Sequence, residues 1–109
     1  MSVVTNAILC FGAGYDGVEI VSKVNQFFDD PRFGFVHVED PKMPAHWWGG
    51  SKMLESEIAI GAFNCLDLDN LIIYLRDMVW EWPREAQLLV KGEDDDVFRS
   101  IYVGGWEPA

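Results

Sequence analysis

Cysteine and histidine are scarce in this sequence, with two residues of each. Cys10 and Cys65 do not form a Cys-x-x-Cys motif, and no cluster of cysteine and histidine has the spacing of a zinc site. We therefore expect no metal and no cofactor. Both cysteines lie in apolar surroundings at the ends of predicted strands, which favours two buried, reduced thiols. A disulfide between them remains an alternative if their strands are neighbours.

Basic residues are also few: eight Lys and Arg stand against 18 Asp and Glu, for a formal net charge of −10. Residues 55–109 hold twelve acids and four bases (net −8), whereas residues 1–54 hold six acids and four bases (net −2). This balance argues against direct binding of nucleic acid and against docking on anionic lipid. An acidic surface instead attracts a basic protein partner. The alternative interpretation is that acidity only keeps a small protein soluble.

Long hydrophobic runs are missing as well. No run approaches the roughly 20 apolar residues that span a bilayer. The first six residues lack the basic start of a signal peptide, so we expect a cytoplasmic protein without membrane contact. Half of the residues are apolar, however, and 109 residues are enough for one domain with a real core.

Hydrophobic periodicity predicts alternating strands and helices. Strands are predicted at residues 3–11, 33–39, 53–63, 86–90 and 97–103. A first helix is predicted from Asp16 to Phe28, and a second from Asp67 or Asp69 to Val79. The predicted core stripes are Val18, Val21, Val24 and Phe28 in the first helix, and Leu68, Leu71, Ile72, Leu75 and Val79 in the second.

The order of these elements predicts an α+β fold. It is β-α-β-β-α-β plus an extra C-terminal hairpin strand, which resembles the ferredoxin-like (split β-α-β) two-layer sandwich. A shift of 51 residues places Asp16 on Asp67 and Val24 on Leu75. We therefore expect one domain, 1–109, with two similar halves at about 3–40 and 53–91 and a connecting loop at 41–52.

Such a fold places both helices on one face of the sheet and leaves the other face without a cover. The alternation of the strands predicts that Phe33, Phe35, His37 and Leu89 point to this second face. A large apolar face rarely stays in water. We therefore expect a homodimer, another partner, or a cover built from the 41–52 loop and the Trp106 tail.

One motif resembles a dinucleotide-binding fingerprint. Gly12, Gly14 and Gly17 form a G-x-G-x-x-G between a strand and a helix, and Glu39 and Asp40 follow about 20 residues later. Asp16 would repel a phosphate at this point, and the predicted sheet has antiparallel neighbours. A plain tight turn is the alternative.

Two further segments suggest binding. Tryptophan is a favoured interface anchor, and Trp47, Trp48 and His46 lie together in the long middle loop, whereas Trp106 lies in the tail. The run Glu93, Asp94, Asp95 and Asp96 lies at a predicted hairpin turn and lacks the spacing of a calcium loop. It is either an acidic contact for a basic partner or a solvated turn. Neither histidine belongs to a recognisable catalytic pattern, so no catalytic residue is predicted.

Three functions follow from these features. The first is an acidic protein-binding module or stoichiometric inhibitor, comparable to nuclease-immunity proteins or nucleic-acid mimics, that acts on a basic protein. The second is a dimeric ferredoxin-like small-molecule-binding protein or enzyme, whose ligand would lie near Phe35, His37 and Trp48. The third is nucleotide binding through the glycine motif. The superfold itself does not choose among them, because it hosts many unrelated activities.

Overall fold

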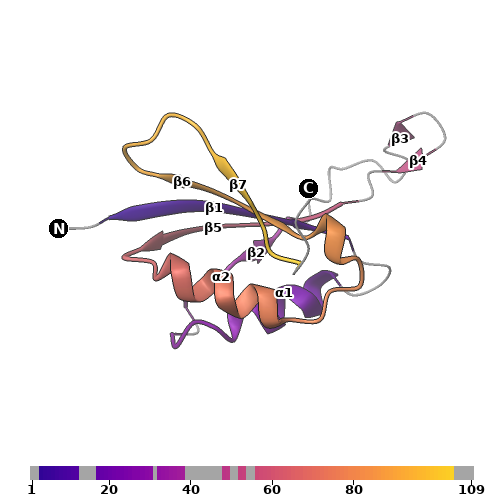
Figure 1. Cartoon of the computed structure of the whole chain (residues 1–109), viewed down its shortest axis with the longest axis horizontal. Coiled ribbons are helices and arrows are strands. Elements are labelled where there is room, and N and C mark those ends of the chain that lie inside the picture. The colour runs from indigo at the N-terminus through magenta and orange to yellow at the C-terminus, as the bar shows by residue number, and fades with distance from the viewer. Residues whose placement is uncertain are drawn as a thin grey trace.

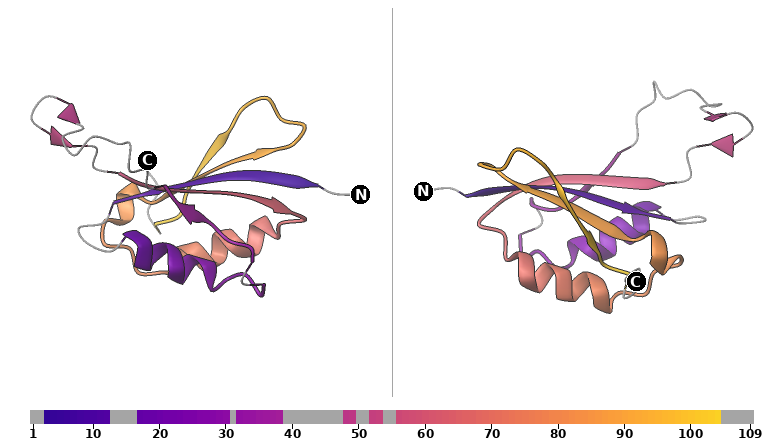
Figure 2. Two further views of the ribbon diagram at one scale, coloured as in Figure 1. Left: turned by 180° about the vertical axis from the view of Figure 1, so that it is seen from behind. Right: turned by 45° about the horizontal axis from the view of Figure 1, so that its top comes forward.

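Five strands form one antiparallel sheet with two helices packed on one of its faces, which is an α+β fold (Figures 1 and 2). The computed structural model describes residues 3–12, 17–30, 32–38, 48–49, 52–53 and 56–104. The strands of the sheet, in the spatial order β2-β5-β1-β6-β7, are β2 (Val36–His37), β5 (Glu57–Asn64), β1 (Val4–Phe11), β6 (Gln87–Gly92) and β7 (Arg99–Tyr102). The helices are α1 (Gly17–Asn25) and α2 (Leu68–Asp77), and a 3-10 turn, η1, spans Pro83–Glu85.

A second, two-stranded ladder is separate from this sheet. It pairs β3 (Trp48–Gly49) with β4 (Lys52–Met53). Figures 1 and 2 show it beyond one end of the main sheet. Of the predicted strand 53–63, only residues 57–63 belong to the main sheet, where β5 continues to Asn64.

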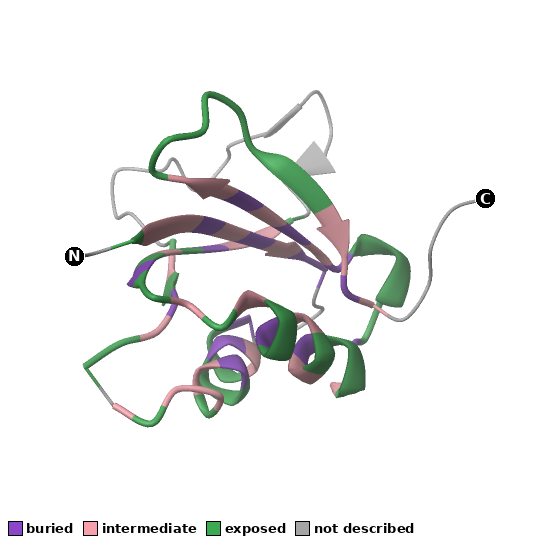
Figure 3. Ribbon diagram, turned by 60° about the vertical axis from the view of Figure 1, so that its left-hand side comes forward, coloured by how far each residue is buried: buried purple, intermediate pink, exposed green. Residues whose placement is uncertain are grey.

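The core lies between the helices and one face of the sheet. β1 is central, and alternate residues Ala7, Leu9 and Phe11 are buried against the helices. The register places Leu9 beside Ala59 on β5 and Leu88 on β6, and all three are fully buried. Figure 3 shows bands of buried residues along the central strands and on both helices. Strict alternation in the strands thus assigns one side chain in two to the core.

The second helix follows its local sequence signals closely. Asp67 is the N-cap, and its side chain accepts a hydrogen bond from the Asn70 amide at 3.3 Å. Leu71 and Leu75 are fully buried, as predicted. Val79, in contrast, lies beyond the helix and is 95% exposed, so its place in the predicted stripe was wrong.

The first helix is shorter than predicted, because it ends at Asn25. Val21 and Val24 are buried as predicted, but Val18 is exposed on the outer side of α1. Phe28 follows the helix and stacks on Phe63 with ring centroids 4.8 Å apart and planes 9° apart. The predicted cap, Asp16, lies outside the described residues.

The predicted phase of the second strand was wrong. Val36 pairs with Ile60 and is exposed, whereas Phe35 is buried in the core beside Phe28 and Phe63. His37 pairs with Ala59 and so shares the helix-covered face with Phe35. The strand is also reduced to two residues. Of the four residues predicted to point to the second face, Phe35 and His37 therefore lie on the opposite one.

The side chain of Asn25 fixes this phase. Its Nδ2 donates to the Phe35 carbonyl at 2.9 Å, and its Oδ1 accepts from the Phe35 amide at 2.7 Å. The preceding Gly34 has φ +153°, and a Cβ there would lie 2.7 Å from the Asn25 side-chain amide. Only glycine fits both the backbone conformation and the close approach. The amide clamp on Phe35 thus replaces the ladder partner that a longer strand would have supplied.

We expect Asn25→Ala to lower the free energy of unfolding by about 1–3 kcal/mol, because it leaves both polar backbone groups of a buried residue without the clamp. Asn25→Asp keeps the acceptor but loses the donor and should lie between Asn25→Ala and wild type. Urea denaturation followed by circular dichroism measures both, with the exposed neighbour Gln26→Ala as the control. An Asn25→Ala variant as stable as Gln26→Ala would show that the clamp contributes nothing.

Candidate functional site

The face of the sheet opposite the helices carries a continuous row of apolar side chains. Cross-strand register aligns Val36 with Ile60, Ile60 with Ile8, and Ile8 with Leu89. Residues paired in this way have side chains on the same face. We call these four residues the open-face row. Leu89 was predicted on this face. Val36 was assigned to the other face through the wrong phase of its strand, and Ile8 and Ile60 were missed because the register between distant strands was unknown.

The open-face row borders a shallow groove of about 620 Å³. Phe98, from the loop before β7, contributes one wall and is 40% exposed. Val36 and Ile60 are 67% and 47% exposed, although both are branched aliphatic residues in a sheet. The described lining residues are Asn6, Ala7, Ile8, Gly34, Val36, Ile60, Gly61, Ala62 and Phe98. The groove is thus almost entirely apolar and open to solvent in the described part of the chain.

The β6–β7 turn projects from the sheet on the side away from the helices (Figures 1 and 3). Two of its four acids hold the turn together. Glu93 Oε1 accepts from the Val4 amide at 2.9 Å, and Asp95 Oδ2 accepts from the Gly92 amide at 2.9 Å. Asp94 and Asp96 are exposed, and no hydrogen bond of either side chain is found within the described residues. All four acids are exposed, but Glu93 and Asp95 bond backbone amides, whereas Asp94 and Asp96 do not.

Three of the predicted contact residues, His46, Trp47 and Trp106, lie outside the described residues. Trp48 lies in β3, whose backbone alone is described. The two tryptophans after α2 differ sharply. Trp80 is buried, whereas Trp82 is 45% exposed.

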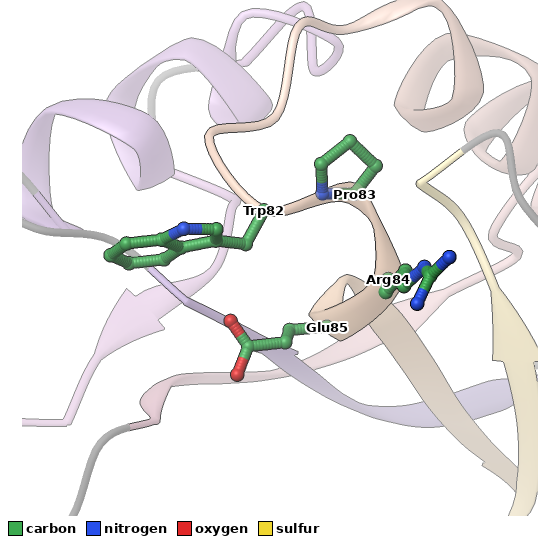
Figure 4. A pocket seen from close by; sticks show the side chains of 4 residues that line it. All are labelled: Trp82, Pro83, Arg84 and Glu85. Carbon is green, nitrogen blue, oxygen red and sulfur yellow. The ribbon is translucent and has the colours of Figure 1, made fainter.

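A hollow of about 490 Å³ lies beside Trp82, and its described lining residues are Trp82, Pro83, Arg84 and Glu85 (Figure 4). Figure 4 shows the Trp82 ring and the Glu85 carboxylate on the same side of the chain, while the Arg84 guanidinium points away from both. A Cβ on Gly12 would collide with Glu85 and Trp82. This first glycine of the motif therefore serves the packing of η1 on the end of β1.

The carboxylate of Glu57, on β5, lies against the start of α1. A Cβ on Gly17 would lie 2.7–2.9 Å from the carboxyl atoms of Glu57, and Glu57 Oε2 is 2.7 Å from His37 Nε2. A dinucleotide fingerprint needs this space for phosphate. Gly14, Glu39 and Asp40 lie outside the described residues. The carboxylate and the antiparallel sheet both weigh against nucleotide binding.

Comparison of the chain with protein-family models, curated proteins and solved structures found no match. Neither helix in the described ranges is long and apolar enough to cross a membrane. Nor do three or more metal-ligating side chains meet in that part of the chain.

Both cysteines are free thiols. Cys10 lies near the end of β1, whereas Cys65 follows β5, and its backbone amide donates to the carbonyl of Val3, just before β1. The two are separated by seven strand positions, or about 23 Å, which excludes a disulfide. The prediction of two buried thiols was wrong for Cys65, which is exposed, and Cys10 is half-buried.

We expect Ellman's reagent at pH 8 to label the two thiols in two phases. Burial raises the pKa of the Cys10 thiol, which lowers its thiolate fraction at this pH, and thiolate is the reacting form. Cys65 should therefore react at least about ten times faster than Cys10. Cys65→Ser should remove the fast phase and Cys10→Ser the slow one. A single phase with both thiols would contradict this assignment.

Proposed function

We propose that the protein is an acidic binding module, or stoichiometric inhibitor, that docks a basic protein on the open face of its sheet. The observation that carries this proposal is the open-face row, in which Val36 and Ile60 are exposed, beside a projecting acidic turn. An apolar centre with a polar rim is the usual anatomy of a protein interface. Asp94 and Asp96 would supply rim charge that selects a basic surface and speeds its approach.

The formal charge of −10 supports a basic partner over a second copy of the chain. Two copies meeting through their open faces would bring two acidic turns and two equal net charges together. Like charges across an interface cost affinity, whereas opposite charges steer encounter. A homodimer therefore remains the less favoured form of the same docking.

The fold and the thiols support two finer parts of the proposal. The order β2-β5-β1-β6 separates β1 from β2 by one strand and β5 from β6 by one strand, and a helix joins each pair. We therefore propose a ferredoxin-like arrangement with β7 added at the edge. Two free thiols suit a reducing compartment, which supports a cytoplasmic location.

The test captures protein partners on the immobilised chain and compares variants. Val36→Thr/Ile60→Thr keeps β-branched side chains but removes apolar contact area. We expect it to weaken binding of the wild-type partner about tenfold or more. Asp94→Asn/Asp96→Asn should weaken binding a few-fold, and this difference should shrink as salt is raised because exposed charges are screened.

Matched controls lie on the outer side of α2. Ile73→Thr removes an isoleucine that is somewhat more exposed than Ile60, and Asp77→Asn removes an exposed aspartate. Both should bind the partner as wild type does. A partner that binds all variants equally, or the absence of any retained protein, would contradict the proposal.

The volume of the groove also favours a second candidate function, a small-molecule binder. About 620 Å³ lies within the range of known ligand pockets. The ligand would contact Ile8, Ile60 and Phe98 rather than the predicted Phe35 and His37. A fluorescent apolar probe, anilinonaphthalene sulfonate, displaced by such a ligand and not by a basic protein would favour this alternative.

A further inference from the structure

A third pocket, of about 580 Å³, lies at one end of the molecule, and none of its described lining residues belongs to the open-face row. There the loop after α1 meets the turn between β5 and α2, as Figures 1 and 2 show from several sides. Its described lining residues are Phe27, Phe28, Asp29, Asp30, Phe33, Phe63, Asn64, Cys65, Leu66 and Asp67. We call it the end pocket. Four of these residues are phenylalanines, three are aspartates and none is basic.

The aromatic walls of the end pocket are held firmly by the core. Phe28 and Phe63 stack at 4.8 Å, and Phe27 meets Phe28 edge to face at 5.3 Å. Phe33 stands at the mouth and is 57% exposed. A rigid wall of rings is well suited to the alkyl part and the flat face of a cationic group.

The carboxylates stand beside these rings. Asp67 caps α2 through the Asn70 amide, and Asp29 is exposed. Asp30 pairs with the guanidinium of Arg32, with Nη2 and Oδ2 2.7 Å apart. The same guanidinium lies 5.8 Å from the centroid of the Phe33 ring. Beside the pocket, the largely exposed Arg32 thus already sets a guanidinium against a carboxylate and near an aromatic ring.

We infer that the end pocket receives an arginine side chain of the basic partner, whose guanidinium contacts Asp29 and whose stem lies against the phenylalanines. This inference rests on the proposed function and names a second contact, distinct from the open face. Arginine is favoured over lysine because a planar guanidinium both stacks on rings and pairs with carboxylates. A partner that spans both sites would gain affinity from two separate anchors.

The first test needs no partner. Isotope-labelled protein is titrated with the capped peptides acetyl-Gly-Arg-Gly-amide and acetyl-Gly-Lys-Gly-amide at low salt, and amide shifts are followed by NMR. We expect saturable shifts at Phe27, Phe33 and Asp67, with the arginine peptide binding more tightly. Asp29→Asn and Phe33→Ala should each weaken binding at least about threefold, whereas Asp77→Asn and Trp82→Ala should not. Shifts spread over all acids, or centred on residues 93–96, would overturn the inference.

The second test separates this inference from the proposed function. Asp29→Asn leaves the open-face row unaltered. It should nevertheless weaken binding of the captured partner about threefold or more. If it weakens the arginine peptide but leaves the partner unaffected, the pocket takes a free guanidinium compound, so the inference fails and the proposed function stands. If no partner is captured, the proposed function fails, and so does the partner arm of the inference, whatever the peptide titration shows.

Discussion

Trp80→Ala is expected to lower the free energy of unfolding by about 3–5 kcal/mol, the range for deletion of a large buried aromatic side chain. Trp80 is buried against Phe11, with ring centroids 5.7 Å apart. Its indole Nε1 donates to the Leu75 carbonyl at 2.8 Å, near the end of α2 where carbonyls lack helical partners. The substitution therefore leaves a cavity and also removes a hydrogen bond.

Trp82→Ala is the matched control, because it removes the same side chain two residues later. Trp82 is 45% exposed, so we expect a loss of about 1 kcal/mol or less. Urea denaturation monitored by far-ultraviolet circular dichroism gives both values without depending on tryptophan emission. Equal losses for the two variants would contradict the assignment of Trp80 to the core and Trp82 to the surface.

Leu9→Ala is expected to cost about 3–5 kcal/mol, because Leu9 is fully buried at the centre of the sheet. Its neighbours across the strands, Ala59 and Leu88, are also fully buried, so the surroundings have little freedom to fill the cavity. Ile60→Thr, on the opposite face, should change stability by about 1 kcal/mol or less. The same denaturation experiment measures both.

This pair also tests which face of the sheet is the core. If Ile60→Thr destabilised the protein as strongly as Leu9→Ala, the open face would be a second buried layer. The proposed docking surface would then not exist in the free protein. A small effect at Ile60 and a large one at Leu9 is the expected pattern.

The parts of the fold that could be predicted are those governed by local sequence. α2 has a capping aspartate at Asp67 and buried leucines one turn apart, so its start and its core face follow from neighbouring residues. The same holds for β1, because the unbroken apolar run at residues 7–11 favours a central strand.

The phase of β2 could not be predicted from hydrophobicity, because the more apolar alternation is the exposed one. Val36 and Val38 are exposed, whereas the helix-covered face holds Phe35 and the less apolar His37. The choice is made by Asn25, ten residues earlier, whose amide clamps the Phe35 backbone. Side chain-to-backbone contacts of this kind leave no periodic signal in the sequence.

The candidate site was only partly predictable for a related reason. The acidic run is visible as composition, but only the geometry separates Glu93 and Asp95, which bond the backbone, from Asp94 and Asp96. The open-face row depends on the pairing of Ile8 with Ile60, which are far apart in sequence. The end pocket likewise joins residues of the α1 loop to residues that follow β5.

Methyl cross-saturation in the complex with the captured partner tests the docking surface most directly. With the partner's protons saturated, we expect the methyl signals of Ile8, Ile60 and Leu89 to lose intensity, while those of Ile73 and Val18 on the helices stay unchanged. Loss confined to Ile73 and Val18, with the three sheet residues unaffected, would place the partner on the helical side and contradict the account.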